Sequence, residues 1–85
     1  MKSAANRRFW KAYAQLPPDI QRLARKKYQL WKRDPRHPSL RFEKIGKVWA
    51  ARVGDDFRAL AQQRGDTFYW FWIGNHDEYE RLIRS

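Results

Sequence analysis

The sequence of 85 residues contains no cysteine. Disulfide bonds and thiolate metal sites are therefore excluded, and the chain must hold its fold by packing alone, which suits a reducing compartment. It also contains no run of about 18 apolar residues, which excludes a membrane-spanning helix. Residues 1–16 lack the apolar stretch of a signal peptide. We therefore expect a cytoplasmic protein that has no membrane partner.

Several motifs of catalysis are missing as well. The sequence has no glycine-rich phosphate loop, no paired carboxylate site and no hydrolase elbow. Its two histidines, His37 and His76, lack the spacing of a metal-ligand pair. We therefore expect neither a metal site nor a cofactor.

Acidic residues are scarce, because nine Asp and Glu stand against 19 Lys and Arg and give a formal net charge of +10. Polyanions or an acidic protein are the natural partners of such a chain. With 42% hydrophobic and 16% aromatic residues the chain can form one core, and its length allows one domain, residues 1–85. A domain this small buries only about 60% of its unfolded surface, so a partner can matter to its stability.

Two helices are predicted in the first part of the chain. Apolar residues fall at helical spacing after Asn6, a candidate N-cap, until Pro17 ends the pattern. Pro18 suits the first turn of a second amphipathic helix, which ends near Arg33. The basic residues of this second helix fit either a nucleic-acid-binding helix or the solvent face of a packed helix. Residues 33–40, "RDPRHPSL", are predicted to form a loop.

Strand patterns follow, over residues 40–45, 47–53, 57–63 and 67–73. Turns at Gly46, at "GDD" (residues 54–56) and at "RGD" (residues 64–66) join these strands as hairpins in series. The last strand, "TFYWFWI", is apolar enough to lie centrally with both faces covered. Residues 76–85 have helical composition. We therefore predict an α+β fold, in which an N-terminal two-helix hairpin packs on a four-stranded antiparallel sheet and a short C-terminal helix follows.

Two arginines flank the predicted turn at residues 54–56. Pairing of the strands would place Arg52 and Arg58 on one face of the sheet. The last strand would deliver His76 and Tyr79 to the same end of the sheet, if it lies beside the strand of Arg58. A phosphodiester there would meet two cations that stabilise its transition state, a histidine for proton transfer and an aromatic ring that can stack on a base. This is the chemistry of metal-free RNA cleavage, with the 2′-hydroxyl of the RNA as nucleophile.

Each of these features also has a purely structural interpretation. The two arginines can face solvent or pair with Asp55, Asp56 or Glu43. A histidine at this place can be a surface residue beside a helix cap formed by Asn75 or Asp77. A domain of this size also needs large side chains in its core, which is the predicted place of Trp10, Trp31, Trp49, Trp70 and Trp72. The residues alone leave catalysis and mere binding both open.

Four phrases, in this order along the chain, carry a resemblance to a known family: "FWKAYAQLPPDIQ", "DPRHPSLRFEKI", "WAARVGDDFRAL" and "FYWFWIGNHDEYERLI". Together they resemble the RelE/ParE superfamily of bacterial toxin–antitoxin toxins, especially its RelE- and HigB-like members. The resemblance covers nearly the whole chain and implies a two-helix hairpin packed on a twisted antiparallel sheet. The chain departs from many members in two ways. We expect it to begin directly with a helix, without their N-terminal strand, and it has fewer basic residues near its C-terminal motif than the RelE type.

The resemblance also implies roles for individual residues. Arg58 in "FRAL" matches the strand arginine that contacts the phosphate, and Arg52 in "ARVG" resembles the basic residue before the turn. His76 occupies the place of a catalytic His or Arg, which implies proton transfer. Tyr79 lies near the place of a C-terminal aromatic that orients or stacks on the nucleotide. We therefore expect these four residues to be catalytic.

Three further cations, Arg41, Lys44 and Lys47, are expected to bind RNA. The resemblance implies a toxin of a toxin–antitoxin pair that acts as a metal-independent, ribosome-dependent mRNA endonuclease and inhibits translation. Its partners would be a cognate antitoxin and mRNA on the ribosome. Two alternatives stay open: a DNA gyrase inhibitor of the ParE type, and a non-catalytic relative that binds RNA or protein.

Overall fold

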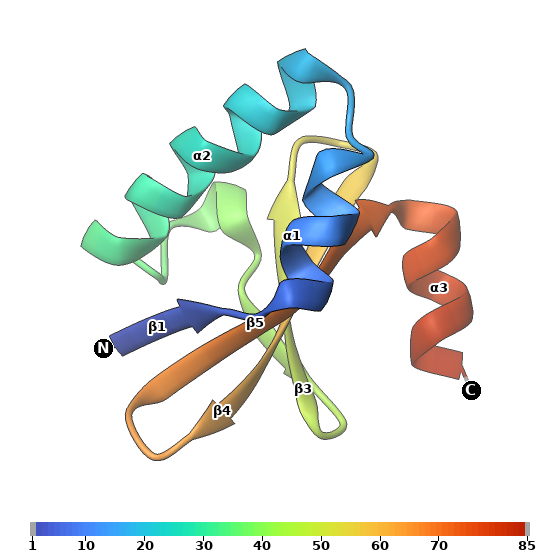
Figure 1. Cartoon of the computed structure of the whole chain (residues 1–85). Coiled ribbons are helices and arrows are strands. Elements are labelled where there is room, and N and C mark those ends of the chain that lie inside the picture. Colours follow the sequence, from blue (N-terminus) through green and yellow to red (C-terminus); the bar gives the residue numbers. More distant parts are fainter. Residues whose placement is uncertain (1, 85) are drawn as a thin grey trace.

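The computed structural model describes residues 2–84. Along the chain these residues form β1 (Lys2–Ala5), α1 (Arg7–Ala14), α2 (Pro18–Arg33), the 3-10 helix η1 (Pro38–Leu40), β2 (Glu43–Ile45), β3 (Val48–Val53), β4 (Phe57–Arg64), β5 (Thr67–Asn75) and α3 (His76–Arg84). Helices α1 and α2 lie against the sheet, and α3 continues from the far end of β5 (Figure 1). The α+β class predicted from the sequence is confirmed.

The sheet formed by residues 2–84 has five strands, in the order β1-β5-β4-β3-β2, and it is mixed. Strand β1 runs parallel to β5, with Lys2 opposite Thr67 and Ala5 opposite Trp70. The predictions of four antiparallel strands and of a chain that begins directly with a helix were therefore wrong. The segment "KSAA" has none of the β-branched or aromatic residues typical of strands, and it becomes a strand because it pairs with the edge of β5. This pairing covers an edge of the most apolar strand.

The two helices after β1 have the predicted local signals, although they do not stand at the N-terminus as a hairpin. The Asn6 side chain caps α1, because its Oδ1 accepts a hydrogen bond from the backbone N of Phe9 at 2.9 Å. Tyr13 and Gln21 then join the helices through two hydrogen bonds, from each side chain to the carbonyl oxygen of the other residue, at 3.2 and 3.0 Å. No helix formed by residues 2–84 is both long and apolar enough to cross a membrane.

Buried side chains gather on both faces of the sheet. On the face of α1 and α2, Trp31 is only 2% exposed and packs with Phe68, Trp70 and other core residues. On the opposite face, Trp72 belongs to a cluster that includes Tyr79 of α3. Strand β5 contributes to both clusters, and a bulge between Trp70 and Trp72 shifts its alternation, so that Trp72 faces away from Phe68 and Trp70. The prediction that this strand lies centrally with both faces covered is confirmed in part: β5 is an interior strand between β1 and β4, but β4 is the central strand, and Tyr69 of β5 is 41% exposed.

The turn between β3 and β4 depends on a glycine. Gly54 has a φ angle of +67°, which is the left-handed region, and a Cβ atom there would lie 2.9 Å from Cδ2 of Leu23 in α2. Gly65, in the turn between β4 and β5, has a φ angle of +60° but no atom within 4 Å of such a Cβ. The two glycines therefore share a backbone conformation and differ in their surroundings.

This difference gives a stability prediction. Gly65→Ala should lower the free energy of unfolding by about 1 kcal/mol through backbone strain. Gly54→Ala should lower it by at least about 1 kcal/mol more, because the methyl group also crowds Leu23. Urea unfolding followed by circular dichroism measures both losses, with Gly65→Ala as the matched control. Equal losses would show that the contact with Leu23 does not constrain the turn.

Candidate functional site

A pocket of about 190 Å³ opens where β2, β3 and β4 meet α3. Nine residues line it: Arg41, Glu43, Ala50, Ala51, Arg52, Arg58, His76, Tyr79 and Glu80. All four residues predicted to be catalytic and one of the three predicted to bind RNA are therefore brought together. The other two, Lys44 in β2 and Lys47 in the following turn, are exposed and do not line the pocket.

The β3–β4 hairpin places the two arginines side by side. Arg52 and Arg58 are directly opposite each other in the antiparallel register. The Arg52 guanidinium donates to the Asp55 carboxylate at 2.7 Å and to the Gly54 carbonyl at 3.1 Å. The Arg58 guanidinium donates to the Phe57 carbonyl at 2.8 Å. The turn therefore holds both cations at one edge of the pocket.

The ion pair between Arg52 and Asp55 supports part of the structural interpretation, yet it leaves the cation accessible. The Asp55 side chain is 91% exposed and the Arg52 side chain 31%. An ion pair this exposed contributes little stability, because water and salt screen it. A phosphate group that entered the pocket could therefore replace Asp55 as the partner of Arg52.

The junction of β5 and α3 positions the imidazole. Oδ1 of Asn75 accepts a hydrogen bond from the backbone N of Glu78 at 2.8 Å, so Asn75 caps α3. The backbone N of His76 donates to the Asp56 carbonyl at 2.7 Å, which ties the start of α3 to the β3–β4 turn. The imidazole is left free of capping, and its Nε2 lies 3.3 Å from Oε1 of Glu80, one helical turn later.

A glycine in β5 permits the packing beneath the pocket. Gly74 pairs with Arg58 across the strands, and a Cβ atom at Gly74 would lie 2.3 Å from Cζ2 of Trp72. The Trp72 ring therefore lies directly against the glycine backbone. This ring, with Leu60 and Tyr79, forms the core cluster on which α3 rests.

Tyr79 is the most buried of the predicted catalytic residues, at 7% exposed. Burial raises the pKa of its hydroxyl above the usual 10.0, the charges of Glu43 and Glu80 raise it further, and Arg58 partly offsets them. At neutral pH the hydroxyl is therefore un-ionised and can donate a hydrogen bond. Because the ring packs in the core cluster, this geometry favours a role of the hydroxyl over stacking of the ring on a base.

The raised pKa of Tyr79 predicts a loss of stability in alkali. The folded protein holds this proton more tightly than the unfolded chain does, and this difference stabilises the folded state. The stabilisation is fully present below about pH 10 and is lost as the pH rises through the folded-state pKa of Tyr79. From about pH 9 to about pH 11, wild type should lose more free energy of unfolding than Tyr79→Phe. The control Tyr69→Phe removes an exposed tyrosine and should follow wild type. If Tyr79→Phe also follows wild type, the environment assigned to Tyr79 is wrong.

Sequence reasoning named Glu43 only as a possible ion-pair partner of the arginines, not as a site residue, and it missed Glu80. Glu43 pairs with Ala50 in the register of β2 and β3, which brings it beside the arginines. Glu80 follows His76 by four residues, a spacing that places both on one face of a helix and was the available signal. Glu43 takes part in none of the ion pairs between residues 2–84. No three potential metal ligands gather anywhere in that part of the chain.

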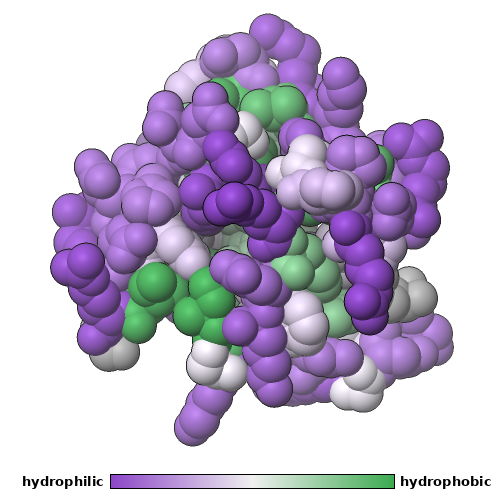
Figure 2. All heavy atoms as spheres, turned by 180° about the vertical axis from the view of Figure 1, so that it is seen from behind, coloured by the Kyte–Doolittle hydropathy of each residue, from purple (hydrophilic) through white to green (hydrophobic). Residues whose placement is uncertain are grey.

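The surface formed by residues 2–84 carries most of the charge of the protein. None of the charged side chains of residues 2–84 is buried, so nearly the whole net charge of +10 faces solvent. The face opposite to that of Figure 1 is covered mainly by hydrophilic residues, with small hydrophobic patches between them (Figure 2). Such a surface attracts polyanions.

The sequence matches no protein-family model and no curated protein sequence. The fold, however, is similar to several solved structures. A chain of the RelB–RelE antitoxin–toxin complex from Methanococcus jannaschii superposes with a TM-score of 0.72 and 16% identity, over 96% of this chain and 98% of that one. The YoeB/ParE toxin from Agrobacterium tumefaciens superposes with a TM-score of 0.67 and 15% identity, over 89% of this chain and 99% of that one. The isolated RelE toxin of E. coli superposes with a TM-score of 0.64 and 13% identity, over 98% of this chain and 96% of that one. The resemblance predicted from the sequence is thus confirmed as a likeness of fold.

Proposed function

We propose that this chain, which has the fold of the RelE/ParE toxins, is the toxin of a toxin–antitoxin pair and cleaves mRNA on the ribosome without a metal ion. One observation carries the proposal: Arg52, Arg58, His76 and Tyr79, four residues expected from the sequence to be catalytic, line a single pocket. The two carboxylates in the same pocket supply groups that can accept a proton.

The arginines would bind the scissile phosphate. In-line attack by the 2′-hydroxyl gives a pentacoordinate transition state with extra negative charge, and fixed cations stabilise it more than they stabilise the ground state. Arg58, which makes no ion pair among residues 2–84, is the main candidate for this contact. Arg52 would also bind the phosphate, once its ion pair with Asp55 has broken. DNA lacks the 2′-hydroxyl and would not be cleaved.

Two groups that line the pocket, one from β2 and one from α3, would move protons. Glu43 would accept the proton of the 2′-hydroxyl while the 2′-oxygen bonds to phosphorus. His76, oriented by Glu80 at 3.3 Å, would donate a proton to the 5′-oxygen as the bond from phosphorus to that oxygen breaks. The products would be a 2′,3′-cyclic phosphate and a 5′-hydroxyl. The Tyr79 hydroxyl, un-ionised and beside Glu43 and Glu80, would orient the phosphate or the attacking oxygen.

The proposal includes two partners. The neighbour from Methanococcus jannaschii is a toxin in complex with its antitoxin, which supports a cognate antitoxin for this chain. An antitoxin with an acidic segment would complement the net charge of +10. Lys44 and Lys47, outside the pocket, would contact phosphates of the bound mRNA or of the ribosome.

Inducible expression in a bacterial host tests this function. Wild type should arrest growth and cut translated messages, whereas Arg58→Ala and His76→Ala should do neither. Arg64→Ala, which changes an exposed arginine of β4 outside the pocket, serves as the matched control and should behave as wild type. Transcript 5′ ends are mapped on translated and untranslated copies of one message. Growth arrest without cuts, unchanged in the variants, would overturn the proposal and favour a gyrase inhibitor.

A further inference from the structure

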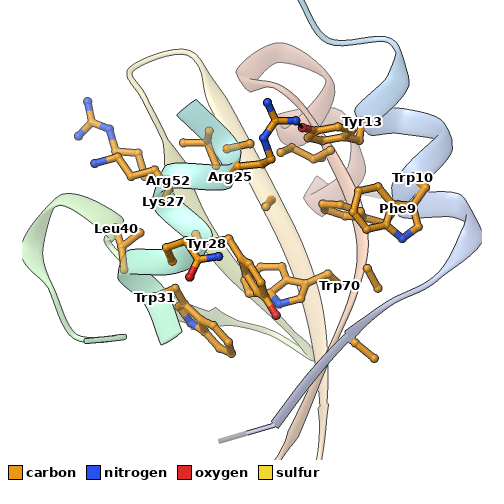
Figure 3. Close-up of a pocket in the computed structure, with 18 residues that line it drawn as sticks. Phe9, Trp10, Tyr13, Arg25, Lys27, Tyr28, Trp31, Leu40, Arg52 and Trp70 are labelled. Atoms are coloured by element: carbon orange, nitrogen blue, oxygen red, sulfur yellow. Dashed lines mark hydrogen bonds between the residues drawn. The ribbon is translucent and has the colours of Figure 1, made fainter. Parts of the chain in front are cut away.

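A larger cavity, of about 370 Å³, lies between the helices α1 and α2 and the sheet, on the face opposite to Tyr79 (Figure 3). Aromatic rings from three elements line it, among them Phe9 of α1, Tyr28 and Trp31 of α2, and Trp70 of β5. The space arises because the residues that face it from α2 and the sheet include the small side chains Ala24, Ala51 and Ala59. Its size is that of a small-molecule site.

Two hydrogen-bond donors in the wall of this cavity have no acceptor. Trp31 is 2% exposed and Trp70 is 6% exposed, and both line the cavity. Neither indole Nε1 has a hydrogen-bond partner among residues 2–84. Both Nε1 atoms are themselves closed off from the cavity, so the two residues present the apolar parts of their rings as the surface that a ligand would meet.

The cavity is also lined by two cations of α2. Arg25 donates to the Tyr13 hydroxyl at 2.7 Å, as the dashed line in Figure 3 marks, and Lys27 donates to the Ser39 hydroxyl at 3.1 Å. Neither takes part in an ion pair between residues 2–84. Both charges are therefore available to an anion whose apolar part lies among the aromatic rings.

We propose that this cavity binds a small amphipathic carboxylate. Its apolar body packs between the aromatic rings and the alanine methyl groups, and its charged head meets Arg25 and Lys27. This site lies on the opposite face of the sheet from Tyr79, although Ala51 and Arg52 line both this cavity and the pocket of the proposed RNA cleavage. Arg25 and Lys27 line only this cavity, so changes to them test it separately.

Decanoate is a suitable probe, and NMR of the indole N–H groups is the readout, because each of the five tryptophans gives one signal. Trp31→Phe and Trp70→Phe assign the two signals of interest. Decanoate should bind saturably below about 1 mM and shift the signals of Trp31 and Trp70, while those of Trp49 and Trp72, which do not line the cavity, stay in place. No saturable binding, or shifts confined to Trp49 and Trp72, would overturn the proposal.

The charge of the head group is tested separately. Arg25→Gln should weaken decanoate binding by about tenfold through loss of a charge-assisted hydrogen bond. Arg22→Gln, an exposed arginine of the same helix outside the cavity, is the matched control and should bind as wild type. Decyltrimethylammonium, with the same chain and the opposite charge, should bind more weakly than decanoate. Equal binding of the two probes, or of the two variants, would contradict a carboxylate site.

Discussion

Arg58→Ala should lower the rate of RNA cleavage by about 10²–10³-fold, the loss typical of removing one group that stabilises transition-state charge. Arg58 lies opposite Arg52 in the hairpin register and donates to the Phe57 carbonyl, so the scaffold holds its guanidinium at the pocket. A cation held in advance costs no reorganisation when charge develops on the phosphate. Arg58→Lys should recover only part of the rate, because a lysine offers a point charge in place of a planar fork of donors.

The measurement is single-turnover cleavage of mRNA on programmed ribosomes with purified protein. Arg64→Ala removes the same charge from the same strand, from a side chain that lies over the Tyr69 ring and does not line the pocket. It should cleave within about twofold of wild type if only local contacts matter. Equal losses in Arg58→Ala and Arg64→Ala would mean that net charge governs the rate, and would remove Arg58 from the active site.

Trp31→Ala should lower the free energy of unfolding by about 3–5 kcal/mol, as truncation of a large core aromatic does. The Trp31 ring is 2% exposed and makes edge-on contacts with Phe42, Phe68 and Trp70, at centroid distances of 5.6, 5.5 and 5.3 Å. These contacts join α2 to the sheet. Since small domains are stable by only about 5–15 kcal/mol, the variant should be close to unfolding at 25 °C.

Trp10→Ala is the matched control for this prediction. Trp10 is 55% exposed, so the prediction that it lies in the core was wrong, and it packs on its own helix against Phe9 and Tyr13. Its truncation should cost about 1 kcal/mol or less. Urea unfolding followed by circular dichroism compares the two variants. Similar losses would show that α2 is not held to the sheet through Trp31.

Local signals in the sequence predicted most of the fold correctly. The Asn6 cap, the Pro18 start of α2 and the turn glycines act within a few residues, so they can be recognised without knowing the rest of the chain. Strand β1 could not be found in this way. Its residues have no strand preference, and its conformation depends on β5, which follows much later in the chain.

In the candidate site, too, contacts set by local sequence could be predicted and contacts set by distant parts of the chain could not. Arg52 and Arg58 could be placed together because a short hairpin turn determines which residues face each other. Glu43 could only be named as one of three possible partners of these arginines, because its place beside them depends on the register of the short strand β2. The cavity lined by Trp31 and Trp70 was equally beyond prediction, since it results from the summed volumes of side chains on several helices and strands.

The central claim is that the pocket of Arg58 and His76 cleaves RNA through the substrate's own 2′-hydroxyl. The most direct test uses programmed ribosomes and two mRNAs that differ by one oxygen atom, where the nucleotide at the mapped cut carries either a 2′-hydroxyl or a 2′-hydrogen. The account predicts a cut in the first message, leaving a 2′,3′-cyclic phosphate, and no cut at that position in the second. Equal cleavage of both messages, or of neither, would contradict it.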